Sequence, residues 1–210
     1  FIIAVGHLAE LLVDGFGVYR SLDLFSILVL VLASSQALMF TFMLILLFDS
    51  RYVTFANVMK HAVPSLVFIL LYVVSCCIEA DVCVYSLAEW RACVVHNLPL
   101  AVRTLFGVTY TVQLFVYIRL FFRKKHRYIT HLKELTGECI SKLELRWTMR
   151  AFLYALSVGI GAWVLLVCPG PIPEFSFSFL IVVFYPAFAW LYTNYHYTYE
   201  MLRRFIVEQD

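Results

Sequence analysis

Histidine, cysteine, serine and acidic residues are the side chains best suited to catalysis, and none falls in a recognisable catalytic arrangement. The histidines are scattered, and no pair has the HExxH spacing that holds zinc. The sequence also lacks a GxSxG nucleophile motif and a glycine-rich phosphate loop. We therefore predict no enzymatic activity, no metal site and no cofactor. The six histidines are His7, His61, His96, His126, His131 and His196.

A polar interval at residues 79–97, together with Arg103, contains the best candidates for binding a small ligand. Arg91 and Arg103 could hold a small anion, with His96 and Asn97 beside them. Ordinary polarity at a membrane interface also explains the same residues and is the interpretation that we favour. Arg103, near the start of an apolar run, can also extend its charge to that interface. The sequence leaves both interpretations open.

Two further candidates lie in the first apolar stretch, at residues 1–18. Glu10 and Asp14 are four residues apart and share one face of a helix, where two ionised carboxylates repel each other. Acidic residues inside a membrane are functional candidates, so both are predicted to be ligand-binding or pathway residues. The stretch is of marginal length, and it either spans the membrane or lies on its surface.

Cysteine placement suggests a disulfide bond on one side of the membrane. Cys83 and Cys93 flank a short amphipathic segment, and a bridge between them would staple that segment to itself. Cys168 could instead join the segment to the fifth predicted span, residues 151–168. Disulfides form outside the cytoplasm, and the charge distribution described below places these cysteines on the outer side of the membrane. The alternative is that cysteine serves only as a small apolar residue in membrane helices.

The elements that must position these residues are apolar runs of a length suited to a membrane. Hydrophobic residues make up 63% of the 210 residues and charged residues 14%, against roughly a quarter charged in soluble domains. Runs of about 20 apolar residues are required by a bilayer and not by a soluble core. We therefore predict an all-α bundle of transmembrane helices. The predicted spans are residues 1–18, 24–48, 62–78, 98–122, 151–168 and 175–199.

The longest polar interval, residues 123–150, carries eight of the sixteen Lys and Arg residues. Because basic loops remain in the cytoplasm, this connector predicts the orientation of the whole chain. The loop at 49–61 and the C-terminus then lie inside too, so that twelve Lys and Arg residues are inside and three outside. We expect two short cytoplasmic helices in the connector, the first extending the preceding span, with a break at Thr136–Gly137.

Several features predict movement and assembly. Pro186 should kink the last span and act as a hinge. Small residues at 33–37 and 157–162 form faces suited to close helix packing, and we expect a homodimer in the lipid bilayer. Residues 1–207 form one transmembrane domain in this interpretation, and residues 208–210 begin a linker to a cytoplasmic domain.

Three stretches together resemble a known family. They are LFDSRYVTFANVMKHAVPSLVFILLYVV at 47–74, RLFFRKKHRYITHLKE at 119–134 and LELRWTMRAFLYALSVGIGAWVLL at 143–166, followed by a proline-rich turn and an aromatic span. Over about residues 24–205 the pattern is similar to the membrane-embedded sensor half of multi-span bacterial AraC-type transcriptional regulators. The resemblance implies a bacterial inner membrane, and a cytoplasmic helix-turn-helix domain after Arg203 that alone contacts DNA.

The predicted function is therefore signal reception at the membrane, in response to an unidentified small-molecule or protein stimulus. The same half could also precede a sensor histidine kinase. A third interpretation is a small-solute transporter or channel, with Glu10, Asp14 and Arg103 as its polar pathway residues. A transporter would be expected to show internal repeats between its halves, and none is evident by eye.

Overall fold

The structure is a computed structural model that describes residues 23–136 and 138–207. Within these ranges the chain forms helices and no strands, so the predicted all-α class is confirmed for them. The predicted first span, with Glu10 and Asp14, lies outside the described residues. The helices are α2 (Ile27–Phe48), α3 (Phe55–Ile78), α4 (Leu87–Cys93), α5 (Leu98–Thr136), α6 (Glu138–Val167) and α7 (Pro171–Val207).

Five of these helices, all except the short α4, are long and apolar enough to cross a membrane. The one remaining predicted span, residues 1–18, lies outside the described residues. Many large apolar side chains on the five helices are exposed, and α3 presents an almost continuous apolar surface. A soluble protein rarely exposes such a surface, whereas lipid tails solvate it without penalty.

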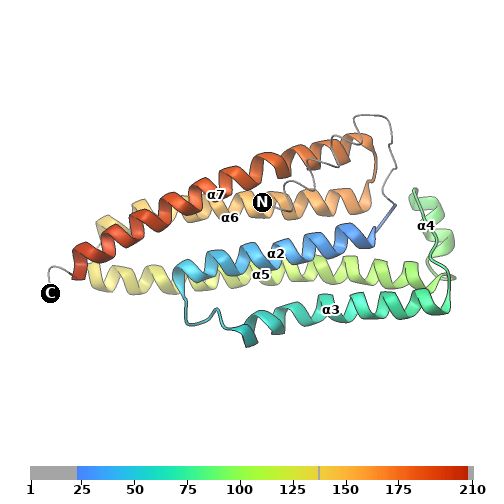
Figure 1. The fold of residues 1–210 in the computed structure, drawn as a ribbon, viewed down its shortest axis with the longest axis horizontal. Helices are drawn as coiled ribbons and strands as arrows, with labels where there is room; N and C mark the ends of the chain where they lie inside the picture. Colours follow the sequence, from blue (N-terminus) through green and yellow to red (C-terminus); the bar gives the residue numbers. More distant parts are fainter. Residues whose placement is uncertain (1–22, 137, 208–210) are drawn as a thin grey trace.

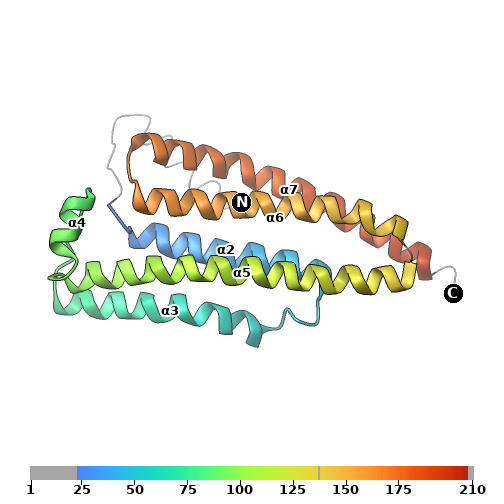
Figure 2. The same cartoon turned by 180° about the vertical axis from the view of Figure 1, so that it is seen from behind.

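The five long helices lie side by side in a slab, and α4 crosses one end of it (Figures 1 and 2). α2 is central and packs against α3, α5 and α6, while α7 packs on α6 at one edge. α3 lies at the opposite edge, against α5 (Figure 1). α2 is apolar around its whole circumference, as expected for a helix that contacts other helices on some faces and lipid on the rest.

Two aromatic and aliphatic clusters hold the slab together. One includes Phe40 of α2, Phe121 of α5, Phe152 of α6 and Phe184 of α7, with the rings of Phe121 and Phe152 stacked at 3.9 Å between centroids. The other lies nearer α4 and joins α2, α5 and α6 through a group of buried residues that includes Phe106. The small-residue faces predicted at 33–37 and 157–162 meet in this second cluster, because Ala33 and Ala162 both belong to it.

The helix bounds differ from the predicted spans at the membrane edges. α3 begins at Phe55 and not at residue 62, since the Thr54 hydroxyl accepts a hydrogen bond from the Asn57 N–H and caps the helix there. Pro64 consequently lies inside α3 and not in its first turn. α7 begins at Pro171 and not at residue 175, because a proline at the first helical position sacrifices no helical hydrogen bond.

Of the two helices predicted in the basic connector, the first extends the preceding span, as expected, and the second is the start of α6 and not a separate short helix. α5 continues without interruption to Thr136, and α6 begins at Glu138, so both halves of the connector extend the spans on either side. The break falls where the sequence predicts it. At this basic end α5, α6 and α7 project beyond α2 and α3 (Figures 1 and 2). We call the opposite end, crossed by α4, the α4 end.

Candidate functional site

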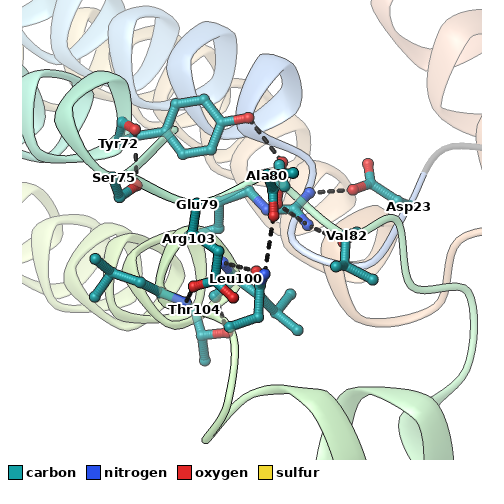
Figure 3. A network of polar contacts seen from close by, with 12 residues as sticks. Asp23, Tyr72, Ser75, Glu79, Ala80, Val82, Leu100, Arg103 and Thr104 are labelled. Atoms are coloured by element: carbon teal, nitrogen blue, oxygen red, sulfur yellow. Dashed lines mark hydrogen bonds and ion pairs between the residues drawn. The ribbon is translucent and has the colours of Figure 1, made fainter. Parts of the chain in front are cut away.

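The most elaborate polar cluster in the described part of the chain surrounds Arg103 at the α4 end (Figure 3). Arg103 lies in the second turn of α5, and its side chain is only 1% exposed. Its Nη1 forms an ion pair and hydrogen bond with Asp23, the first described residue before α2. Its Nη2 lies 3.1 Å from Oδ1 of Asp81 and donates a hydrogen bond of 2.9 Å to the carbonyl oxygen of Val82.

A second layer of contacts fixes one of these carboxylates. The Tyr72 hydroxyl on α3 donates a 2.8 Å hydrogen bond to the other oxygen of Asp81, Oδ2 (Figure 3). The guanidinium therefore connects three elements through two aspartates: the turn before α2, the loop after α3 and α5 itself. We call Asp23, Tyr72, Asp81 and Arg103 the Arg103 cluster.

The loop at residues 79–84 is held against α5 by two further side chains. Asn97, which is buried, donates to the carbonyl oxygen of Ala80 at 3.0 Å and accepts from the Leu100 N–H at 3.0 Å, so it also caps α5. The Glu79 carboxylate accepts from the Leu98 N–H at 2.9 Å. These contacts explain why the loop is ordered although it has no secondary structure.

The turn before α2 is pinned on its other side as well. The Leu24 N–H donates to the Val84 carbonyl oxygen at 2.7 Å, and the Phe25 N–H donates to the Leu166 carbonyl oxygen at 3.1 Å. Phe25 has a positive φ of 55°, a conformation that a bulky residue adopts only when its surroundings impose it. Its ring lies directly over Gly107, where an added Cβ would stand 2.7 Å from Phe25 Cδ1.

The electrostatics of the Arg103 cluster bear on the predicted anion site. Two carboxylates and one carbonyl group already surround the guanidinium, so the cluster carries one negative charge in excess if both aspartates are ionised. Arg103 is buried, whereas Arg91 is exposed on α4. Arg103 is paired with carboxylates of the chain itself, and the binding of a free anion by Arg91 and Arg103 stays a prediction.

The remaining predicted site residues are dispersed. Asn97 joins the Arg103 cluster through the 79–84 loop, whereas His96 beside it is exposed. Cys83, Cys93 and Cys168 are all free thiols, so neither predicted bridge is formed in this structure. Pro186 lies inside α7 with helical residues on both sides, and its hinge role stays a prediction.

Sequence reasoning missed two members of the Arg103 cluster as partners of the arginine. Asp23 lies just before the predicted span at 24–48, and Tyr72 lies inside the predicted span at 62–78, so neither is singled out by the sequence. A charge count could have found Asp23, because an arginine inside an apolar run requires an acidic partner from a neighbouring element. Tyr72 gave no signal, since its role depends on the loop after α3 folding back toward α5.

The basic end carries a second, simpler ion pair. Lys124 of α5 donates a 2.8 Å hydrogen bond to Asp49, which follows α2, and its Nζ lies 3.7 Å from the centre of the Tyr52 ring. The hydrogen bond from Lys124 holds the pKa of Asp49 below its usual range. This pair is partly solvated, with 36% of the Asp49 side chain exposed. It attaches the loop between α2 and α3 to the middle of α5.

The described residues contain no group of three or more histidine, cysteine, aspartate or glutamate side chains suited to hold a metal ion. Comparison with known proteins adds no relative: no family model, curated protein or solved structure matches the chain. Any functional assignment therefore depends on the geometry of this chain and on its sequence pattern.

Proposed function

We propose that this chain is a membrane signal-reception domain, which couples a stimulus at the α4 end or within the bundle to a DNA-binding output domain at the basic end. One observation carries the proposal. α5 is an unbroken helix that begins in the Arg103 cluster and continues to Thr136, in the basic extension. A conformational change at one end can therefore reach the other through a single rigid element.

The dimensions of the helices support this coupling. α5 has 39 residues and α7 has 37, which correspond to about 58 and 55 Å at 1.5 Å per residue. The hydrocarbon core of a bilayer is only about 30 Å thick. α5 and α7 are thus long enough to cross the bilayer and continue well into water.

The charge distribution supports the orientation. Basic residues gather at the end where α5 and α6 meet, and the positive-inside rule then places this end in the cytoplasm of a bacterial inner membrane. The α4 end, with Glu79, Asp81 and Glu89, faces outward in this arrangement. A stimulus that alters the contacts of the 79–84 loop would bias the position of α5, and any differential affinity for two such positions produces a switch.

The family resemblance adds the identity of the output. In AraC-type regulators with such a membrane half, a helix-turn-helix domain follows the last span, and here it would follow α7. A homodimer is part of this proposal, because such output domains act in pairs. The small-residue faces of α2 and α6 pack within the chain, with Ala33 and Ala162 buried, so they do not provide the dimer contact.

The proposal can be tested by rotating the residues that follow the last span about the axis of α7, in the full-length protein within its native host. One alanine inserted after Asn194, where the span ends, rotates everything beyond by about 100°, whereas seven inserted residues restore the phase to within about 20°. We expect the single insertion to change the transcripts that depend on this protein and the seven-residue insertion to behave like the unaltered protein. Transcript sequencing and chromatin immunoprecipitation of the tagged protein provide the readouts.

The alternatives give different results in the same experiment. A sensor histidine kinase would alter transcripts without itself enriching DNA fragments. A transporter would enrich no DNA, and its loss would reduce uptake of a solute independently of helix phase. If deletion of the gene and both insertions leave the transcripts unchanged, the signalling proposal is wrong.

A further inference from the structure

A cavity of about 30 Å³ lies between α2, α5 and α6, away from both the Arg103 cluster and the basic end. Most of its wall is apolar. Its polar side chains are Gln36 and Thr41 from α2 and Tyr110 and Tyr117 from α5, while α6 contributes small and apolar residues around Gly159. A water molecule needs roughly 10–15 Å³ of such space, so the cavity has room for about two. It is far smaller than the pockets that bind drug-sized ligands.

Gln36 is the residue that gives this cavity a chemical role. Its side chain is only 6% exposed, and within the part of the chain that the structure describes its Nε2 has no hydrogen-bond partner. A buried amide donor without a partner costs about 1–3 kcal/mol, which an apolar residue at the same position would avoid. A small acceptor in the cavity that Gln36 lines would satisfy this donor.

The other polar groups of the wall suit water as this acceptor. The Tyr110 hydroxyl donates its hydrogen to the Gly159 carbonyl oxygen at 3.1 Å, which leaves its oxygen free to accept. A water molecule that accepts from Gln36 Nε2 can therefore donate to the hydroxyl oxygens of Tyr110 or Thr41. Buried water typically forms two to four hydrogen bonds of this kind. The four polar side chains of the wall, two from α2 and two from α5, are enough for these hydrogen bonds.

We propose that this cavity is an internal hydration site within the membrane-spanning bundle, holding about two water molecules anchored by Gln36. The site is independent of the signalling role, because it follows from the volume and the side chains alone. It places exchangeable hydrogen bonds between α2 and α5, where the rest of the interface is apolar.

X-ray hydroxyl-radical footprinting of the purified protein in lipid nanodiscs tests this site. Radiolysis of bound water oxidises the side chains beside it, even where they are shielded from bulk solvent. We expect Tyr110 and Tyr117 to be oxidised several-fold more than Phe106 and Phe121, each normalised to the unfolded chain. These two phenylalanines are equally buried but do not line the cavity.

The variant Gln36→Leu should lower the oxidation of Tyr110 to the level of the two phenylalanines. Gln113→Leu is the matched control, since Gln113 is also a buried glutamine but exchanges hydrogen bonds with Ser65 and lies outside the cavity wall. If Gln36→Leu does not fold, Gln36→Met removes the same donor with a more adaptable side chain.

Two outcomes would overturn the proposal. If Tyr110 and Tyr117 in the unaltered protein are oxidised no more than Phe106 and Phe121, the cavity contains no water, whether it is dry or holds an organic molecule. If Gln36→Leu and Gln36→Met both leave the oxidation of Tyr110 unchanged, Gln36 is not the anchoring donor.

Discussion

Arg103 and Lys124 are cations on the same helix, α5, and each pairs with an aspartate from another element, yet their surroundings differ sharply. Arg103 is fully buried, with two carboxylates, whereas Lys124 pairs with a single carboxylate whose side chain is one-third exposed. Burial removes the solvent screening that weakens a surface pair, so the same chemistry has very different consequences at the two ends. Charge fixes the α4 end, whereas the ion pair described near the basic end is partly solvated.

The difference also bears on the proposed signal transfer. An element that carries a signal needs one end held in a defined arrangement and another end free to respond. The Arg103 cluster joins three elements at once, and loss of the arginine leaves two mostly buried carboxylates without their counter-ion. The Lys124–Asp49 pair should open at a lower cost, because the Asp49 carboxylate is one-third exposed and water solvates it when the pair separates.

The largest expected effect follows from removing the buried cation. Arg103→Met leaves the charges of Asp23 and Asp81 without their partner, and loss of one partner of a buried pair costs about 3–5 kcal/mol. We expect a large fall in the free energy of unfolding, measured by detergent titration in micelles. The exposed Arg119 of the same helix provides the control, because Arg119→Met removes the same charge from an exposed position.

A rescue experiment separates lost charge balance from lost packing. The triple variant Arg103→Met, Asp23→Asn, Asp81→Asn removes all three charges and should recover much of the lost stability, since apolar or neutral replacement of a complete buried ion pair is often tolerated. A triple variant as unstable as Arg103→Met alone would show that packing, and not charge pairing, gives the cluster its importance.

A smaller effect is expected at Tyr72, which contacts Asp81 and not the guanidinium itself. Tyr72→Phe removes the hydroxyl that donates to Asp81 but keeps the ring. Hydrogen bonds to charged groups contribute about 1.5–3 kcal/mol, and the partial exposure of Asp81 places this one toward the lower limit. The same detergent titration measures the change, with Tyr154→Phe on the exposed face of α6 as the control. Equal stability of the two variants would show that the Tyr72–Asp81 bond contributes nothing.

The sequence predicts the helices far better than it predicts their contacts. Apolar run length reveals the spans, because the thickness of the bilayer imposes it, and the break near Thr136 follows from the local pattern. The start of α3 was predicted seven residues late, since Lys60 and His61 resemble loop residues although the Thr54 cap begins a helix before them. Polar residues near a membrane edge are compatible with both a loop and a solvated first helical turn.

The contacts of the Arg103 cluster are non-local, and this explains why the site was only partly foreseen. Asn97 and Arg103 were selected because they are polar residues beside an apolar run. Their partners lie on other elements, and no local pattern identifies which elements meet. Gln36 is the opposite case: an amide within an apolar run is a visible signal, but its unpartnered Nε2 becomes evident only once α5 and α6 close around it.

The smallest effect is expected at the basic end, where Asp49→Asn removes the charge that pairs with Lys124. A partly solvated pair contributes at most about 1 kcal/mol, and this contribution should weaken with added salt.

Because the folded-state pKa of Asp49 is lowered, the pair stabilises the protein above the pKa of an unfolded aspartate, about 3.9, and loses its effect as the pH falls through the lower folded-state value. Unfolding titrations of Asp49→Asn and the unaltered protein should therefore differ slightly at pH 7 and converge toward pH 3. Arg123→Met, which removes an exposed charge next to Lys124, should show no such pH-dependent difference, and a loss at Asp49 as large as that of Arg103→Met would contradict the contrast between the two ends.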